Sequence, residues 1–319
     1  MSRRSLKTVY CHPEGRFATD GSRHERKILR FAQNDRQSGI FVRTGCWLVV
    51  SAAMALGCSP SPTMTSSEAT PSASRNDRDA LVQFSLLAAL AADDYRGGPP
   101  LSAVLAGGDF GIGTFNDLDG EMIVLDGEIF QALADGTVRR ADMAGTTPFA
   151  AVTDFEEDGR FEDVSPASLS ELDQQLDRQL PRHNSPYAIR IEGEFAELVL
   201  RSVPAQKPPF RPLVEVVKDQ VTWQHRNVRG TLIGLRCPEW MSAINVAGFH
   251  WHFISDDRQI GGHVLGCTFH DLAAQFDECT SVVIRVPQTR EFDRFDADAV
   301  SQQDIEKIER QRPRGAISE

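Results

Sequence analysis

The sequence predicts an α+β protein of two lobes, each a mixed β-sheet with a few helices. Three observations support this fold class. Short apolar segments joined by hairpin-type dipeptides lie between residues 121 and 141. One stretch, residues 169–180, has its leucines three or four positions apart, as on one face of a helix. A second group of strand-like segments begins near residue 247.

The first lobe is expected over residues 77–204, and a β-meander is its clearest feature. EMIVL, EIFQAL and TVRRA are separated by Asp126-Gly127 and Asp135-Gly136, dipeptides that two-residue hairpin turns prefer. Upstream, the middle of residues 77–94 is predicted to be helical, although LVQFS could open a strand instead. A short helix is expected at Leu101–Leu105, directly after two prolines.

The end of the first lobe is expected to hold a helix and two strands. The amphipathic helix over residues 169–180 has serine available as its N-terminal cap. Strands are expected at residues 187–191 and 194–200, with a turn at Glu192-Gly193. The irregular segment PAQKPPFRP then predicts a lobe boundary near residue 204.

The second lobe is expected over residues 205–311. Its strands are predicted at residues 247–254, 261–267 and 281–286. The charged segment at residues 296–310 is predicted to form a terminal helix, followed by a tail over 312–319.

The N-terminal segments differ from the rest of the chain. Residues 1–43 are basic and lack an apolar period, which indicates a disordered leader or a start codon placed too far upstream. Residues 44–58 hold an apolar run, too short to span a bilayer, that ends in the lipobox-like Ala-Leu-Gly-Cys. With a Ser/Pro/Thr-rich linker over 59–76, this order indicates an exported protein, lipid-anchored at Cys58 in the periplasm or cell envelope. The alternative is a disordered or mistranslated leader on a cytoplasmic enzyme.

Charge and cysteine content narrow the function classes. The net charge of −11 disfavours binding to the phosphate backbone of nucleic acids. Outside the N-terminal segments, Cys237, Cys267 and Cys279 have no CxxC spacing. They therefore indicate neither a disulfide framework nor a cysteine zinc site, although one disulfide is possible.

Three histidines in AGFHWHFISDDRQIGGHVLGC form the strongest motif, and they predict a metal site on the second lobe. His250 and His252 lie two apart, so in a strand both leave one face while the flanking aromatics leave the other. A hairpin centred between Asp257 and Arg258 places His263 opposite His252. Cross-strand neighbours are about 5 Å apart at Cβ, so the three imidazoles are predicted to converge on one zinc ion with a fourth position open.

The same ligands are compatible with other functions. Three histidines with an open position also hold the zinc hydroxide of hydratases and hydrolases, and an exported lipoprotein could use them only to bind metal. Taken singly, each histidine is more often a hydrogen-bonded structural residue than a ligand.

Longer motifs resemble the bacterial alpha-acetolactate decarboxylases. They are GDFGIGTFNDLDGEMIVLDGEIFQALADGTV, TTPFA, RSVPAQKPPF and GTLIGLRCPEWMSAINVAGFHWHFISDDRQIGGHVL, within residues 78–310. The resemblance implies a homodimeric enzyme that converts 2-acetolactate to acetoin and carbon dioxide. It also implies a metal held by the HxH pair and the later histidine.

The resemblance further assigns roles to residues that the motifs alone would not single out. Glu121 is expected at the metal site, Arg201 to be the essential cation, and Thr114 to lie near the substrate. A glutamate near the C-terminus completes the pocket, and spacing favours Glu309 over Glu306. Without the resemblance, Glu121 and Arg201 would be interpreted as solvated or salt-bridged residues at strand ends, and Thr114 as an ordinary strand threonine.

The expected chemistry follows from the substrate. Loss of carbon dioxide from a β-keto acid leaves an electron pair on the former ketone, and a Lewis acid that chelates the hydroxyl and carbonyl oxygens stabilises it. The fork of Arg201 suits a carboxylate or a developing oxyanion. Glu121 or Glu309 would return the proton to carbon.

Overall fold

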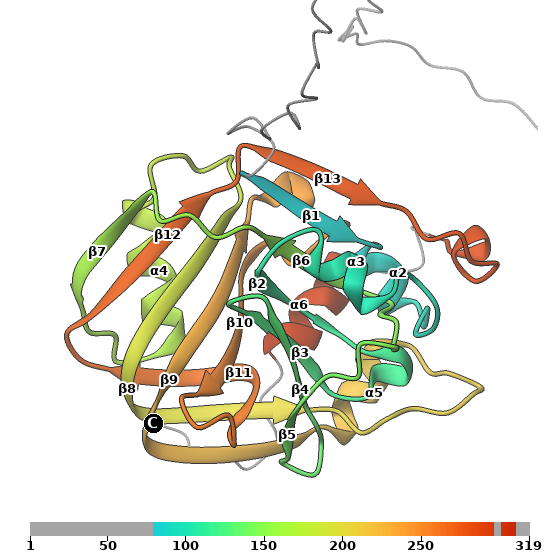
Figure 1. Cartoon of the computed structure of the whole chain (residues 1–319), viewed down its shortest axis with the longest axis horizontal. Coiled ribbons are helices and arrows are strands. Elements are labelled where there is room, and N and C mark those ends of the chain that lie inside the picture. The colour runs from blue at the N-terminus through green and yellow to red at the C-terminus, as the bar shows by residue number, and fades with distance from the viewer. Residues whose placement is uncertain (1–78, 297–300, 311–319) are drawn as a thin grey trace, which may run out of the picture. The chain divides into compact units, whose positions relative to one another are not determined.

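The computed structural model describes residues 79–296 and 301–310, and all structural statements refer to these residues. The predicted leader, signal segment, linker and tail, and with them Cys58, lie outside the described residues. Two β-sheets dominate the fold (Figure 1).

The first sheet has seven strands in the order β13-β1-β6-β2-β3-β4-β5. It is mixed, because β1 and β13 are parallel while the other neighbours are antiparallel. Its strands are β1 (Ala80–Phe84), β2 (Phe110–Thr114), β3 (Glu121–Leu125), β4 (Glu128–Ala132), β5 (Val138–Arg140), β6 (Ala150–Thr153) and β13 (Ser281–Arg285).

The second sheet has six antiparallel strands in the order β11-β10-β9-β8-β12-β7. Because β11 pairs with both β10 and β8, the strands β8, β9, β10 and β11 close on themselves. The strands are β7 (Gly159–Val164), β8 (Tyr187–Ser202), β9 (Val221–Cys237), β10 (Gly248–Ser255), β11 (Gly261–Phe269) and β12 (Leu272–Glu278).

Apolar side chains from both sheets share one core, which includes Ile112 and Ile123 of the first sheet and Ile233 and Leu235 of the second. The opposite face of the second sheet packs against α4, and that of the first sheet against α3. The helices α2, α5 and α6 form a further cluster. The helices are α2 (Leu87–Ala91), α3 (Leu101–Leu105), α4 (Leu169–Gln179), α5 (Leu213–Val216) and α6 (Gln302–Arg310). None is long and apolar enough to cross a membrane.

Most of the predicted elements are confirmed. The meander forms β3, β4 and β5, with Asp126 and Gly127 in the positive-φ conformations of their turn. The helix over residues 169–180 is α4, and the Ser168 hydroxyl accepts a hydrogen bond from the Glu171 amide as its cap. In residues 77–94, the strand alternative is correct for LVQF, and the helix is limited to α2.

Two expectations about β8 and its neighbours are wrong. There is no turn at Glu192-Gly193, because β8 runs unbroken and pairs with β9 along its whole length, with Gly193 opposite Gly230. A side chain at Gly193 would collide with Leu272, so this glycine serves close strand packing rather than a turn.

The sheets also do not divide at residue 204. β7 and β8 precede that residue but belong to the second sheet, and β13 follows it but belongs to the first. A parallel edge strand such as β13 has no hairpin signal that would link it to β1 in the sequence. The three cysteines Cys237, Cys267 and Cys279 are free and buried, so they form no disulfide.

Candidate metal centre

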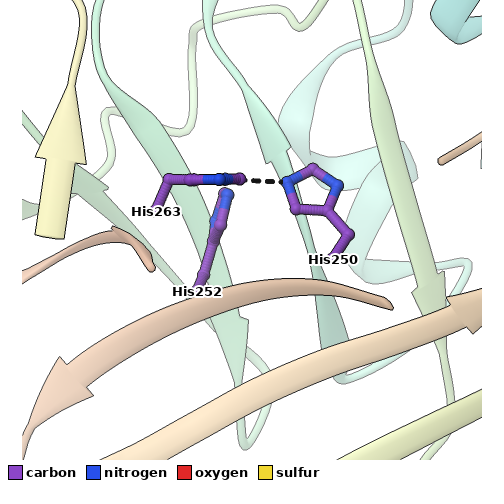
Figure 2. A group of neighbouring side chains, drawn as sticks. All are labelled: His250, His252 and His263. Carbon is purple, nitrogen blue, oxygen red and sulfur yellow. Dashed lines mark hydrogen bonds between the residues drawn. The ribbon is translucent and has the colours of Figure 1, made fainter. Parts of the chain in front are cut away.

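Three histidine side chains converge between the two sheets. His252 of β10 pairs directly with His263 of β11, so the predicted register is confirmed. One ring nitrogen from each of His250, His252 and His263 lies within 4.8 Å of the others. Figure 2 shows the three rings turned toward one another. We call them the histidine trio.

Strand alternation produces this arrangement. His250 and His252 face the first sheet, while Trp251 and Phe253 enter the core on the α4 side. The Trp251 indole donates a hydrogen bond to Asp173 of α4 at 2.8 Å. Its ring occupies the space above Gly234, where a Cβ would lie 2.1 Å from the indole. Close packing of Trp251 on the α4 side therefore fixes the strand segment that carries the two histidines.

A hydrogen bond from the other sheet orients His252. Its Nδ1 lies 2.8 Å from the carbonyl oxygen of Met122 on β3. Because a carbonyl only accepts, Nδ1 carries the proton and Nε2 keeps its lone pair for a metal. That Nε2 lies 3.5 Å from Oε2 of Glu121. Between the other two rings, His250 Nε2 and His263 Nδ1 are 3.1 Å apart.

Burial keeps two of the three histidines, His250 and His252, uncharged. Desolvation, and then the charge of Arg201, lowers the pKa of His250 to about 3. Desolvation likewise depresses the pKa of His252 well below its usual value, with the neighbouring His250 and Arg201 acting in the same direction. Neutral imidazoles are the form that ligates metal.

The trio fits a zinc ion. Three buried imidazole nitrogens lie close together, as in the three-ligand set of catalytic zinc sites. The hydrogen bond of His252 Nδ1 to the Met122 carbonyl leaves the lone pair of His252 Nε2 available to the metal. Glu121 stands next to them and offers a carboxylate oxygen, a further hard ligand or a proton acceptor.

The structure brings Arg201, Glu121 and Thr114 to the same place. Arg201 lies on β8, opposite His263 of β11, and its side chain is 5% exposed. Its Nε makes no hydrogen bond within the described part of the chain. Thr114 pairs with Glu121 across β2 and β3, and its hydroxyl donates to the Gly120 carbonyl. The cation and the carboxylate therefore come from different sheets.

One pocket joins these residues. Its polar side is formed by Thr114, Glu121, Arg201 and His250. The apolar part of its lining, which we call the apolar wall, comes from α2, the turn before β3, the residue before β6, the segment from Val203 to α5, and α6. The apolar wall consists of Leu87, Leu90, Leu118, Phe149, Val203, Leu213 and Ile308.

Sequence reasoning did not identify the apolar wall, because its leucines and valines have no distinctive spacing. The C-terminal glutamates are only partly addressed by the structure. Glu306 and Glu309 both belong to α6, whose Ile308 lines the pocket, but their side chains lie outside the described residues.

A profile of the alpha-acetolactate decarboxylase family matches residues 81–298. The chain belongs to this family. It is therefore an enzyme of the carboxy-lyase class.

Individual relatives are similar over most of their length. The alpha-acetolactate decarboxylase of Methanosarcina mazei is 40% identical over 75% of this chain and 83% of its own. That of Klebsiella aerogenes is also 40% identical, over 66% and 82%. The crystal structure of the Bacillus subtilis strain 168 enzyme superimposes with a TM-score of 0.70 at 35% identity, covering 72% of this chain and 99% of that one.

Proposed function

We propose that this protein converts 2-acetolactate to acetoin and carbon dioxide with a zinc ion held by His250, His252 and His263. The observation that carries the proposal is the buried histidine trio beside a pocket that also contains Arg201 and Glu121. Bound there, zinc would supply Lewis-acid polarisation of the substrate's hydroxyl and carbonyl oxygens.

Arg201 provides the positive charge that an anionic substrate requires. It is buried, and none of the ion pairs between described residues includes it, so its charge is available to a ligand. We infer that its guanidinium binds the substrate carboxylate and then the negative charge that develops as the carbon–carbon bond breaks.

The remaining polar residues handle the proton and the orientation. Decarboxylation breaks the bond between C1 and C2, and the electron pair moves onto the ketone to give an enediolate that must gain a proton at C2. Glu121 lies beside the trio and is proposed to deliver that proton, with Glu309 as the second candidate. Thr114 is proposed to contact the substrate from β2, where its hydroxyl is held by Gly120.

The apolar wall supports a small, partly apolar substrate. It lines the same pocket as the polar residues, so the methyl groups of 2-acetolactate can lie against leucine and valine side chains. Apolar side chains around a buried guanidinium lower the local dielectric constant, which strengthens the interaction of Arg201 with a carboxylate.

The test is an acetoin assay on the purified full chain. We expect acetoin from racemic 2-acetolactate, loss of activity with a chelator, and recovery with zinc. Arg201→Ala is expected to lower kcat/KM by roughly 10³-fold while zinc content stays unchanged. Arg226→Ala, which alters an exposed arginine on β9, is the matched control. Carbon dioxide hydration or ester cleavage without acetoin would overturn the proposal in favour of a zinc-hydroxide enzyme. Zinc binding unaffected by either arginine change, without any turnover, would indicate a metal-binding lipoprotein instead.

We also propose a homodimer and an exported, lipid-anchored form. The edge strand β13 exposes Val283 and Ile284 beside Val286, which supports a second copy at that edge. Changing Ile284 to Lys is expected to shift the protein to monomer in sedimentation experiments.

For export, a Cys58→Ser variant is expected to lose labelling by a fatty-acid analogue and to leave the membrane fraction. Equal labelling of both proteins would contradict the anchor.

A further inference from the structure

The apolar wall is assembled from segments that are distant in sequence. The helix α2 contributes two leucines, the short turn before β3 contributes one, and the stretch that leads from β8 into α5 contributes two more. These residues are Leu87, Leu90, Leu118, Val203 and Leu213. Outside the pocket, Asp117 of the turn is hydrogen-bonded to residues of the other two segments.

The backbone of Asp117 joins two of the segments to the turn. Its amide donates to the carbonyl of Tyr95, just after α2, at 2.8 Å. Its carbonyl accepts from the amide of Gln206, in the segment that leads to α5, at 2.6 Å. The turn is thus hydrogen-bonded to the other two segments through one residue.

The carboxylate of Asp117 adds a third connection. It accepts hydrogen bonds from Arg96 Nε at 2.6 Å and Nη2 at 3.2 Å. The Arg96 guanidinium lies 5.3 Å from the centre of the Phe210 ring, and Tyr95 packs edge-on against the same ring. The hydroxyl of Tyr95 also donates to the carbonyl of Arg211. Hydrogen bonds and ring contacts therefore connect the segments around residues 95, 117 and 210 to one another.

The turn itself has an unfavourable backbone conformation. Asp117 and Leu118 are both left-handed, with φ of 63° and 56°. Aspartate tolerates this region, but a bulky residue such as leucine rarely adopts it. Leu118 is nevertheless 2% exposed and directed into the pocket. Such a conformation persists only where its surroundings fix it, and the contacts of Asp117 provide that constraint.

We propose that Asp117 is a positioning residue that fixes the apolar wall relative to the histidine trio and thereby sets the size of the alkyl group that the pocket accepts. It does not line the pocket and acts through Leu118 and the two segments bonded to it. The identity of that alkyl group rests on the proposed function, whereas the mechanical role of Asp117 does not.

The mechanical role is tested by hydrogen exchange of the full chain. Asp117→Ala removes the carboxylate and disfavours the left-handed conformation, so we expect exchange to accelerate by about threefold or more both in residues 86–96 and in 203–213. Asp117→Asn keeps a residue that tolerates positive φ and should have a smaller effect. Arg140→Gln, which breaks the exposed ion pair with Glu128 on β4, is the matched control and should change neither segment. Acceleration confined to residues 115–120 would overturn the proposal.

Selectivity is tested with 2-acetolactate and the homologue that carries an ethyl group on C2. In Asp117→Ala and Arg96→Gln we expect the ratio of kcat/KM values to shift by about threefold toward the ethyl compound, mainly through KM, with zinc content unchanged. An equal loss for both substrates would mean that Asp117 serves stability alone and would contradict the proposal. If the unaltered protein makes no acetoin, the proposed function fails, and the exchange experiment still decides the role of Asp117.

Discussion

The histidine trio and the apolar wall face the same pocket but are built differently. The three histidines lie on neighbouring strands whose positions are fixed by continuous backbone pairing from β8 to β11. The apolar wall comes from short helices and turns that are joined by a few side-chain and backbone contacts around Asp117. The candidate metal ligands are therefore supported by continuous strand pairing, whereas the apolar wall is held in place by few contacts.

The largest effect is expected from the trio. His252→Ala removes the ligand whose tautomer is fixed by Met122, so we expect loss of bound zinc and a drop in kcat/KM of roughly 10³-fold or more. Metal analysis and the acetoin assay measure this, with the exposed His183→Ala as control. Full zinc occupancy in His252→Ala would show that the trio is not the metal site.

The packing behind the trio should be nearly as sensitive. Gly234→Ala would place a Cβ 2.1 Å from the Trp251 ring, and overpacking of this kind costs about 3 kcal/mol of unfolding free energy. Denaturant titration measures it. Adding Trp251→Phe shortens the ring that collides and should recover part of the loss; no recovery would place the strain elsewhere.

The sheet that carries the trio should also respond to pH. Burial, together with the charge of Asp158, raises the pKa of Asp277 on β12 to about 7. Since this value lies above that of the unfolded chain, the folded state binds the extra proton, and its stability falls as pH rises from about 4 to about 7. Asp277→Asn should remove that dependence and gain about 2 kcal/mol at pH 8. If the free energy of unfolding varied with pH in the same way in both proteins, Asp277 would not be the source of the pH dependence.

The smallest effect is expected at the apolar wall. Leu118→Ala leaves the metal ligands in place but removes most of one apolar contact, so KM should rise by about tenfold with kcat and zinc content nearly unchanged. Steady-state kinetics with 2-acetolactate measure both constants. A fall in kcat with constant KM would mean that this wall is as closely involved in the reaction as the trio.

The same contrast explains what the sequence could predict. The pairing of His252 with His263 followed from strand periodicity and hairpin symmetry, which are local rules. Leu118 shares a cluster with Leu87 and Leu213, residues far from it in the sequence, and no local pattern encodes that association. Glu121 and Arg201 were found only through family motifs, because a carboxylate at a strand end and an arginine at another have many possible surroundings.

The errors in the fold have a similar origin. Glu192-Gly193 has the composition of a turn, yet a partner strand of matching length made β8 continuous across it. The placement of β13 beside β1 is a parallel pairing between the two ends of the described chain, so the lobe boundary expected near residue 204 could not account for it.

The hydrogen bond between His252 and the Met122 carbonyl also links the candidate metal site to the core. The donor belongs to one sheet and the acceptor to the other, so its length follows the spacing between the sheets. That spacing is set by the apolar side chains they share, such as Ile123 and Ile233. A substitution in this shared core, outside the pocket, should consequently change the affinity of the candidate site for zinc.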